Sequence, residues 1–213
     1  MQIVEALDLA NAGSFPRSDV WNRAQSEVEA AIEKADWPHG SGSFSLNPEA
    51  KTTAGGGSDR HPNGVEPIKV PMIEHLRSCG WETEALPKLP VGTAGRDVLT
   101  TGDLDALLLD NDSYVGFEWE TGNVSSSHRA INKLLDGITR GSLQGGILVV
   151  PTRETARYLT ERVGNFEELA PYFEFWNRYP MPNGVLRIYG VAHDRLDPRT
   201  PYIPKRTDGR ARR

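Results

Sequence analysis

Residues 103–123, DLDALLLDNDSYVGFEWETGN, bring several carboxylates close together in the sequence. Two segments of strand-forming residues flank Asn111 and Asp112, which are typical turn residues. This pattern predicts a β-hairpin. A turn centred on these two residues gives one register, in which Asp110 faces Ser113.

The predicted register places acidic side chains of the two strands opposite each other. Asp105 would face Glu118, and Asp103 would face Glu120, with Cβ atoms about 5 Å apart in each directly opposed pair. Because side chains alternate along a strand, Glu118 and Glu120 would also share one face. Like charges this close destabilise a hairpin unless a cation compensates, and hard cations such as Mg²⁺ prefer oxygen ligands. The pattern therefore predicts a metal site; the alternative is a solvated face of an edge strand.

Other common catalytic centres are not predicted. The five histidines lack the HExxH spacing of a zinc site, and no glycine-rich loop follows a strand in the Rossmann or Walker form. Three serines precede His128 on one predicted helix, where nothing orients the imidazole as a base. The single cysteine, Cys79, excludes a disulfide framework within the chain and indicates a reducing compartment. No leader or membrane-spanning run is evident, so we expect a cytoplasmic protein without a membrane partner.

The elements around the hairpin indicate an α/β domain, for which 213 residues are sufficient. Helices are predicted over 18–35, 63–79, 125–140, 152–163 and 166–177, and strands over 81–89, 145–151 and 185–191. Glu82 and Glu84 would share one face of the first of these strands. Residues 38–62 are typical of a loop, with a short strand possible at 43–46, and residues 1–16 match no pattern that we can assign.

The end of the chain is basic. Residues 195–213 hold seven Lys and Arg against two Asp, a charge of +5; because the whole chain carries −5, residues 1–194 carry −10. A basic end is often only a solubilising tail, but beside a carboxylate metal site it favours contacts with phosphate.

Residues suited to contact DNA follow the hairpin. Ser125 and Arg129 lie at the start of a predicted helix just after Glu120, and a helix N-terminus attracts phosphate. Farther along, Glu161 and Arg162 form an acid–base pair; arginine pairs bidentately with guanine, and a carboxylate accepts from cytosine N4. Carboxylates, a cation, a helix start and a basic tail together predict a phosphodiester hydrolase acting on DNA.

Two long motifs closely resemble the BamHI family of type II restriction endonucleases: FEWETGNVSSSHRAINKLLDG and YLTERVGNFEELAPYFE. Two shorter segments match the same family, NGVEPIK and IPKRTDGR. The resemblance extends from about residue 21 to the end. It implies an α/β fold of the PD-(D/E)xK restriction-endonuclease type, with a central mixed sheet flanked by helices. It also implies a homodimer that cuts both strands of duplex DNA at the palindrome GGATCC with one or two Mg²⁺ ions, or Mn²⁺ in their place, leaving 5′ overhangs. Residues 1–194 would form the catalytic and dimerisation domain, and residues 195–213 the DNA-contacting tail.

The resemblance also assigns catalytic roles. Asp105 and Glu118 match metal-binding acids of the family. Glu84 matches a further acidic ligand, with Glu82 as the fallback. Glu120 matches the second acid of the ExE motif, where most nucleases of this fold have lysine, and it would be the base or the group that orients the attacking water.

DNA contacts and the dimer interface are assigned in the same way. The positions that read bases in the major groove match Asn123, Ser125, Arg129, Glu161 and Arg162. Asp208 matches a minor-groove contact, and Lys69 is a candidate phosphate contact. Glu161 stands where the family has aspartate, which is one methylene shorter. Arg140 and Glu174 would lie at or near the interface between the two subunits.

Two other classes of function share some of these features. A DNA-binding protein that no longer cuts would have no need of Asp105, Glu118 and Glu120, all of which are intact. A two-carboxylate glycosidase would require neither a metal ion nor duplex DNA. Digestion of plasmid DNA with and without Mg²⁺ separates the three classes.

Overall fold

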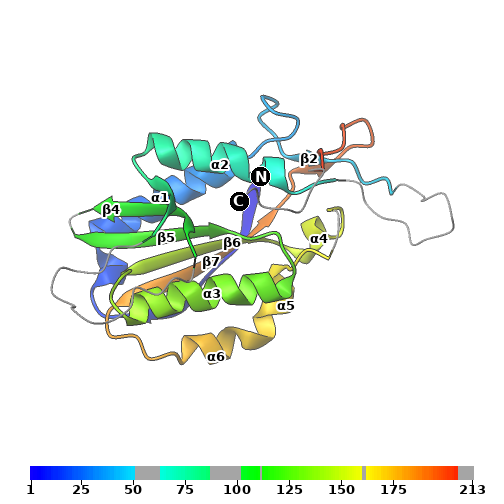
Figure 1. The fold of residues 1–213 in the computed structure, drawn as a ribbon. Helices are drawn as coiled ribbons and strands as arrows, with labels where there is room; N and C mark the ends of the chain where they lie inside the picture. Colours follow the sequence, from blue (N-terminus) through cyan, green and yellow to red (C-terminus); the bar gives the residue numbers. More distant parts are fainter. Residues whose placement is uncertain (51–62, 87–101, 111, 160–161, 206–213) are drawn as a thin grey trace.

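The protein is described by a computed structural model covering residues 1–50, 63–86, 102–110, 112–159 and 162–205. A six-stranded sheet lies at its centre, with helices on both faces (Figure 1). Its strands, in spatial order, are β1 (Gln2–Ala12), β7 (Gly184–Ala192), β6 (Gly145–Pro151), β5 (Ser113–Trp119), β4 (Leu104–Asp110) and β3 (Glu82–Ala85). The pairs β5–β6 and β6–β7 are parallel and the others antiparallel, which confirms the predicted mixed sheet.

The helices form two layers, each covering its own hydrophobic core. On one face lie α1 (Asp19–Lys34) and α2 (Glu66–Ser78); on the other lie α3 (Val124–Thr139), α5 (Phe166–Leu169) and α6 (Phe173–Asn177) (Figure 1). Short helical segments, η1 (Phe15–Arg17), α4 (Arg153–Ala156) and η2 (Ala170–Tyr172), link these elements. A separate parallel pair joins β2 (Ser45–Leu46) to β8 (Arg195–Leu196). Among the described residues, no helix is long and apolar enough to cross a membrane.

The predicted hairpin and the first helix are confirmed. Strands β4 and β5 pair antiparallel with Asp110 opposite Ser113, as expected from the turn residues. Helix α1 begins after Ser18, whose Oγ accepts a hydrogen bond from the amide of Trp21 at 3.2 Å. Both features depend on contacts between residues close in the sequence.

Two predicted elements are corrected, and one element was not predicted. The described residues of the predicted helix 152–163 form only the short α4, because Leu159 leaves the helix to form a bridge with Asn63 beside the start of α2. The predicted helix 166–177 is divided into α5, η2 and α6, and Pro171, which has no N–H to donate, stands at the break. Residues 2–12, for which no element was predicted, form the edge strand β1 against β7.

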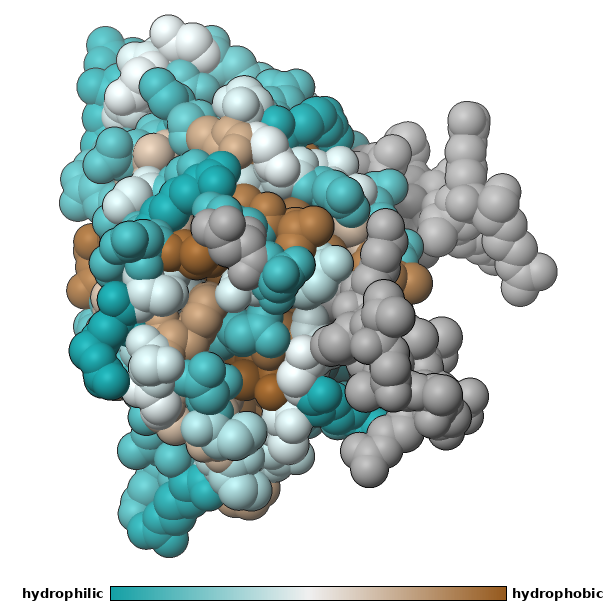
Figure 2. Space-filling view, turned by 90° about the vertical axis from the view of Figure 1, so that its left-hand side faces the viewer, coloured by the Kyte–Doolittle hydropathy of each residue, from teal (hydrophilic) through white to brown (hydrophobic). Residues whose placement is uncertain are grey.

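The two ends of the hairpin have different surroundings. Figure 2 shows the end of the molecule at which β4 and β5 turn, where apolar patches lie among hydrophilic residues. Leu109, next to this turn, is 50% exposed. Asp105, Glu118 and Glu120 lie near the opposite end of these strands, toward the start of α3.

Candidate active site

The hairpin brings Asp105 and Glu118 together, as predicted. The observed pairing continues to Ala106 and Phe117, so the next opposed pair in this register is Asp105 and Glu118. The backbone amide of Trp119 donates a hydrogen bond of 2.9 Å to Oδ2 of Asp105. This bond holds the Asp105 carboxylate against β5, beside Glu118.

Glu118 is a buried carboxyl, only 7% exposed. Its pKa is raised to about 7, chiefly because burial penalises the charged form. The hydrogen bond and charge of Lys133 oppose this rise, whereas the nearby charges of Asp105 and Glu120 add to it. The carboxyl therefore titrates close to neutral pH.

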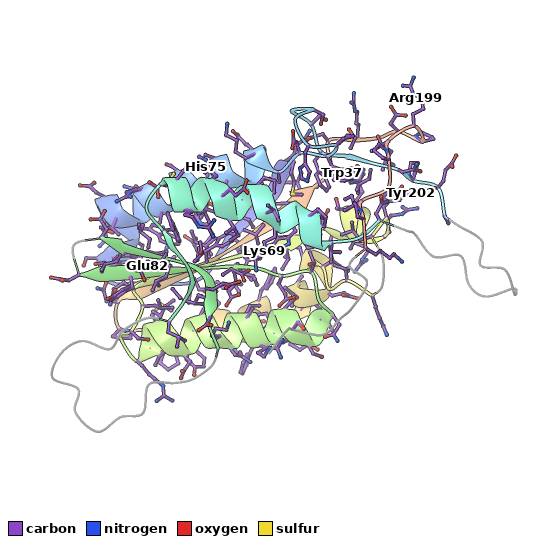
Figure 3. All side chains as sticks on the ribbon, turned by 45° about the horizontal axis from the view of Figure 1, so that its top comes forward. Trp37, Lys69, His75, Glu82, Arg199 and Tyr202 are labelled. Carbon is purple, nitrogen blue, oxygen red and sulfur yellow. The ribbon has the colours of Figure 1, made fainter. Side chains whose placement is uncertain are left out.

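Two lysines from helices on opposite faces of the sheet reach these carboxylates. Lys133 on α3 forms an ion pair with Glu118 and donates a second hydrogen bond of 3.0 Å to the backbone oxygen of Asp103. Lys69 on α2 forms an ion pair with Oδ1 of Asp105. Figure 3 shows Lys69 on α2, between this helix and the strands. Sequence reasoning proposed Lys69 only as a phosphate contact and missed Lys133, although that residue borders the apolar stripe of a predicted helix.

Glu120 lies just beyond β5 and is held by the turn that follows. Its backbone amide donates to Val149 O at 3.0 Å, and its carboxylate accepts from the amide of Gly122 at 2.6 Å. A Cβ at Gly122 would approach Oε1 of Glu120 to 2.8 Å and would push this carboxylate aside, so glycine preserves its position. The carboxylate is thus positioned by its own turn, next to the Asp105–Glu118 pair, whose charge environment it affects.

The two glutamates of β3 lie at the edge of the sheet. Thr83 pairs with Ala106 and Ala85 with Leu104, so the register places Glu84 opposite Asp105. Glu84 and Glu82 are both exposed, and Glu84 has a φ of +52°, in the left-handed region. This register favours Glu84 over Glu82 as the acid nearest to Asp105, and the role of either as a ligand stays a prediction.

The predicted convergence of three or four carboxylates requires a correction. Across the ranges that the structure describes, no group of three or more His, Cys, Asp or Glu residues is placed to hold a metal ion. Asp105 and Glu118 do come together, but a lysine ammonium pairs with each of them. Lys69 and Lys133 compensate the like charges of Asp105 and Glu118, and the predicted divalent cation at these carboxylates stays a prediction.

Several predicted DNA-binding residues gather at the start of α3. Asn123 caps this helix, its Oδ1 accepting from the amide of Ser126 at 3.2 Å. Exposed side chains on this surface belong to Asn123, Ser125, Arg129 and Arg162. The amide of Gly164 donates to Gly122 O at 2.7 Å, which brings the segment after Arg162 against the turn before α3. Predicted contacts Glu161 and Asp208 lie outside the described residues.

The fold and the comparisons with known proteins agree on the class of protein. A crystal structure of the restriction endonuclease BglII with a DNA 16-mer matches with a TM-score of 0.61 and 13% identity, covering 91% of this chain and 79% of that one. This likeness confirms a restriction-endonuclease fold.

Sequence similarity identifies the family. The family model "Restriction endonuclease BamHI" matches residues 1–210, so the chain belongs to the BamHI family of restriction endonucleases. The type II restriction enzyme OkrAI of Oceanobacter kriegii is 38% identical over 211 residues, which cover 99% of each chain. The type II restriction enzyme BamHI of Bacillus amyloliquefaciens is 33% identical over 196 residues, covering 90% of this chain and 84% of its own. The family expected from the two motifs is confirmed.

Proposed function

We propose that this restriction endonuclease hydrolyses both strands of duplex DNA at GGATCC in a Mg²⁺-dependent reaction that leaves 5′ overhangs, and that it acts in the cytoplasm. The observation that carries the proposal is the cross-strand pair Asp105 and Glu118, held by the hairpin register in a chain of the BamHI family. Two adjacent carboxylates, each held in place by its own hydrogen-bond donor, are the arrangement expected for acids that share a cation.

The donor chemistry at this pair fits Mg²⁺ or Mn²⁺. Asp105 and Glu118 supply hard carboxylate oxygens, and the ammonium groups of Lys69 and Lys133 show that each carboxylate accommodates a positive charge. Glu84, opposite Asp105 on β3, would complete the ligand set for one or two ions. The bound cation would polarise the scissile phosphate and lower the pKa of an attacking water.

The protein's own groups would orient the reaction around that centre. The Trp119 amide holds Asp105, and Lys133 holds Glu118. Glu120, positioned by the amide of Gly122, would accept the proton of the attacking water or orient it.

Specificity would come from the surface at the start of α3. Arg162 would pair with a guanine and Glu161 would accept from a cytosine amino group, with Asn123, Ser125 and Arg129 supplying further contacts in the major groove. Asp208 would contact the minor groove. Because these positions keep the family's residues or their chemistry, the expected site is GGATCC, despite the longer Glu161.

Part of the basic tail lies beside the start of α2. The amide of Gly64 donates to Ile203 O at 2.8 Å, and the amide of Ile203 donates to Oδ1 of buried Asn63 at 3.2 Å. These bonds tie Ile203, within the basic tail, to the turn that precedes α2. This anchoring supports a tail, 195–213, that contacts DNA phosphates next to the domain formed by 1–194.

A homodimer is the assembly that a palindrome requires. Phe175 on α6 is 68% exposed and Tyr172 on η2 is 48% exposed, which is unusual for large aromatic side chains. Tyr172 also contacts the ring of His128 on α3, so α3 and the 166–177 segment form one continuous surface. Arg140 at the end of α3 and Glu174 on α6 would lie near the interface.

Digestion of plasmid DNA, followed by sequencing of the ends, tests the proposal. The unchanged protein is expected to cut at GGATCC only when Mg²⁺ or Mn²⁺ is added. Asp105→Asn and Glu118→Ala are expected to abolish cleavage while keeping specific binding to a GGATCC duplex. Ends at another sequence would refute the specificity, and cleavage that survives both substitutions would refute the metal-site assignment.

A further inference from the structure

We propose that Lys69 is a built-in competitor of the divalent cation, which leaves Asp105 when the metal binds, whereas Lys133 stays in place as a positioning residue for Glu118. The inference rests on the proposed function, because it concerns the same carboxylates. It follows from the different ways in which the two ammonium groups are held.

Lys133 is fixed by burial and by two acceptors. Its side chain is 13% exposed and that of Glu118 is 9% exposed. Its ammonium group pairs with the Glu118 carboxylate and also donates to Asp103 O at 3.0 Å. Displacing it would leave a buried carboxylate without its partner, which is strongly unfavourable. Lys133 is therefore expected to keep its contacts in the metal-bound protein.

Lys69 is held much more weakly. Its side chain is 37% exposed, and it reaches Asp105 from the other face of the sheet. Ion pairs of exposed lysines contribute little, because solvent screens the charges and the long side chain loses freedom. The long, flexible stem of lysine allows the ammonium group to swing away.

Asp105 does not depend on Lys69 for its orientation. Lys69 contacts Oδ1, whereas Oδ2 accepts the 2.9 Å hydrogen bond from the Trp119 amide. If Lys69 leaves, this backbone bond still directs the carboxylate toward Glu118. The freed oxygen would then be available to a cation.

This exchange also accounts for two features of the site. In the metal-free protein, Lys69 and Lys133 neutralise two acids that would otherwise repel each other across the hairpin. Once released, the Lys69 ammonium group would lie beside the metal site, where the predicted phosphate contact is needed. One lysine would thus stabilise the free protein and then contact the substrate.

Metal affinity of the DNA-free, full-length protein tests the competition. Lys69→Met removes the charge but keeps a side chain of similar length, and Lys34→Met on α1 is the matched surface control. Mn²⁺ binding, measured by electron paramagnetic resonance, is expected to tighten about two- to fivefold in Lys69→Met, the range that removal of a weak exposed pair predicts. Lys34→Met is expected to match the unchanged protein, and Lys133→Met is expected to bind no more tightly than it.

Release of the side chain can be observed directly by chemical labelling. Acylation of lysines, read by mass spectrometry, is expected to rise at Lys69 when Mg²⁺ is added, relative to Lys34 in the same sample. Labelling of Lys133 is expected to stay low.

Either of two results would overturn the inference: equal Mn²⁺ affinity of Lys69→Met and the unchanged protein, or Lys69 labelling that does not respond to Mg²⁺. Both could occur while the unchanged protein still cuts GGATCC. Failure of the proposed function would be recognised separately, as absence of metal-dependent cleavage by the unchanged protein.

Discussion

The buried carboxyl of Glu118 makes the stability of the metal-free protein depend on pH, and Glu118→Gln is expected to remove that dependence. Its pKa is about 7 in the folded protein, against an ordinary value of 4.5. Between these values the folded state keeps a proton that the unfolded state has lost. The free energy of unfolding therefore falls as pH rises through this window.

The size of the effect follows from the shift. Each pKa unit corresponds to about 1.4 kcal/mol, so a rise from 4.5 to about 7 costs up to about 3 kcal/mol once Glu118 is fully ionised. Screening by solvent reduces this little, because the side chain is only 9% exposed. The ion pair with Lys133 already opposes the shift. The Glu118 contribution is fully present below its unfolded pKa and disappears as pH rises through the folded pKa.

The assay is denaturant unfolding of the unchanged protein and Glu118→Gln in chelator, at several values between about pH 5 and about pH 8. Other groups titrate in both proteins, so the quantity to follow is the difference in unfolding free energy between the two. That difference is expected to move in favour of Glu118→Gln by about 2–3 kcal/mol across the range. A constant difference would refute the reasoning, because it would mean that Glu118 keeps an ordinary pKa.

Two further substitutions and one deletion test the proposed binding to DNA and between subunits. Arg162→Ala should weaken binding to a GGATCC duplex by about 1–3 kcal/mol and spare non-specific binding at low salt; equal weakening on both DNAs would contradict the base contact. Deletion of residues 205–213 should lower the slope of log affinity against log salt by about 0.9 for each DNA phosphate that the tail neutralises; an unchanged slope would show that the tail does not bind DNA. Phe175→Glu, which places a charge on the exposed surface of α6, should shift the protein toward monomer in sedimentation, and Lys34→Glu, at an exposed position of α1 on the other face of the sheet, is the control; a dimer of unchanged stability would place the interface elsewhere.

Much of the fold could be predicted because it depends on neighbours in the sequence. The residue types at 111 and 112 predict the register that β4 and β5 have, so the opposition of Asp105 and Glu118 follows from local pattern alone. The cap at Ser18 is equally local. The family could be recognised for a related reason, since its two motifs are continuous segments.

Elements that depend on distant partners were not predictable in this way. Strand β1 exists because β7 offers it an edge nearly the whole chain away. The end of α4 is set by the bridge between Leu159 and Asn63, which competes with continuing the helix. The helix or strand propensity of the residues in either segment carries no information about these distant partners.

The charges at the site also depend partly on local sequence and partly on distant residues. The sequence alone determined that acids would face each other across the hairpin, because side-chain alternation and turn type are local properties. Only the tertiary structure decided what balances their charge, since Lys69 and Lys133 arrive from helices on opposite faces of the sheet. It also decided that the two lysines differ, because burial and the number of acceptors depend on packing that brings together residues from separate parts of the chain.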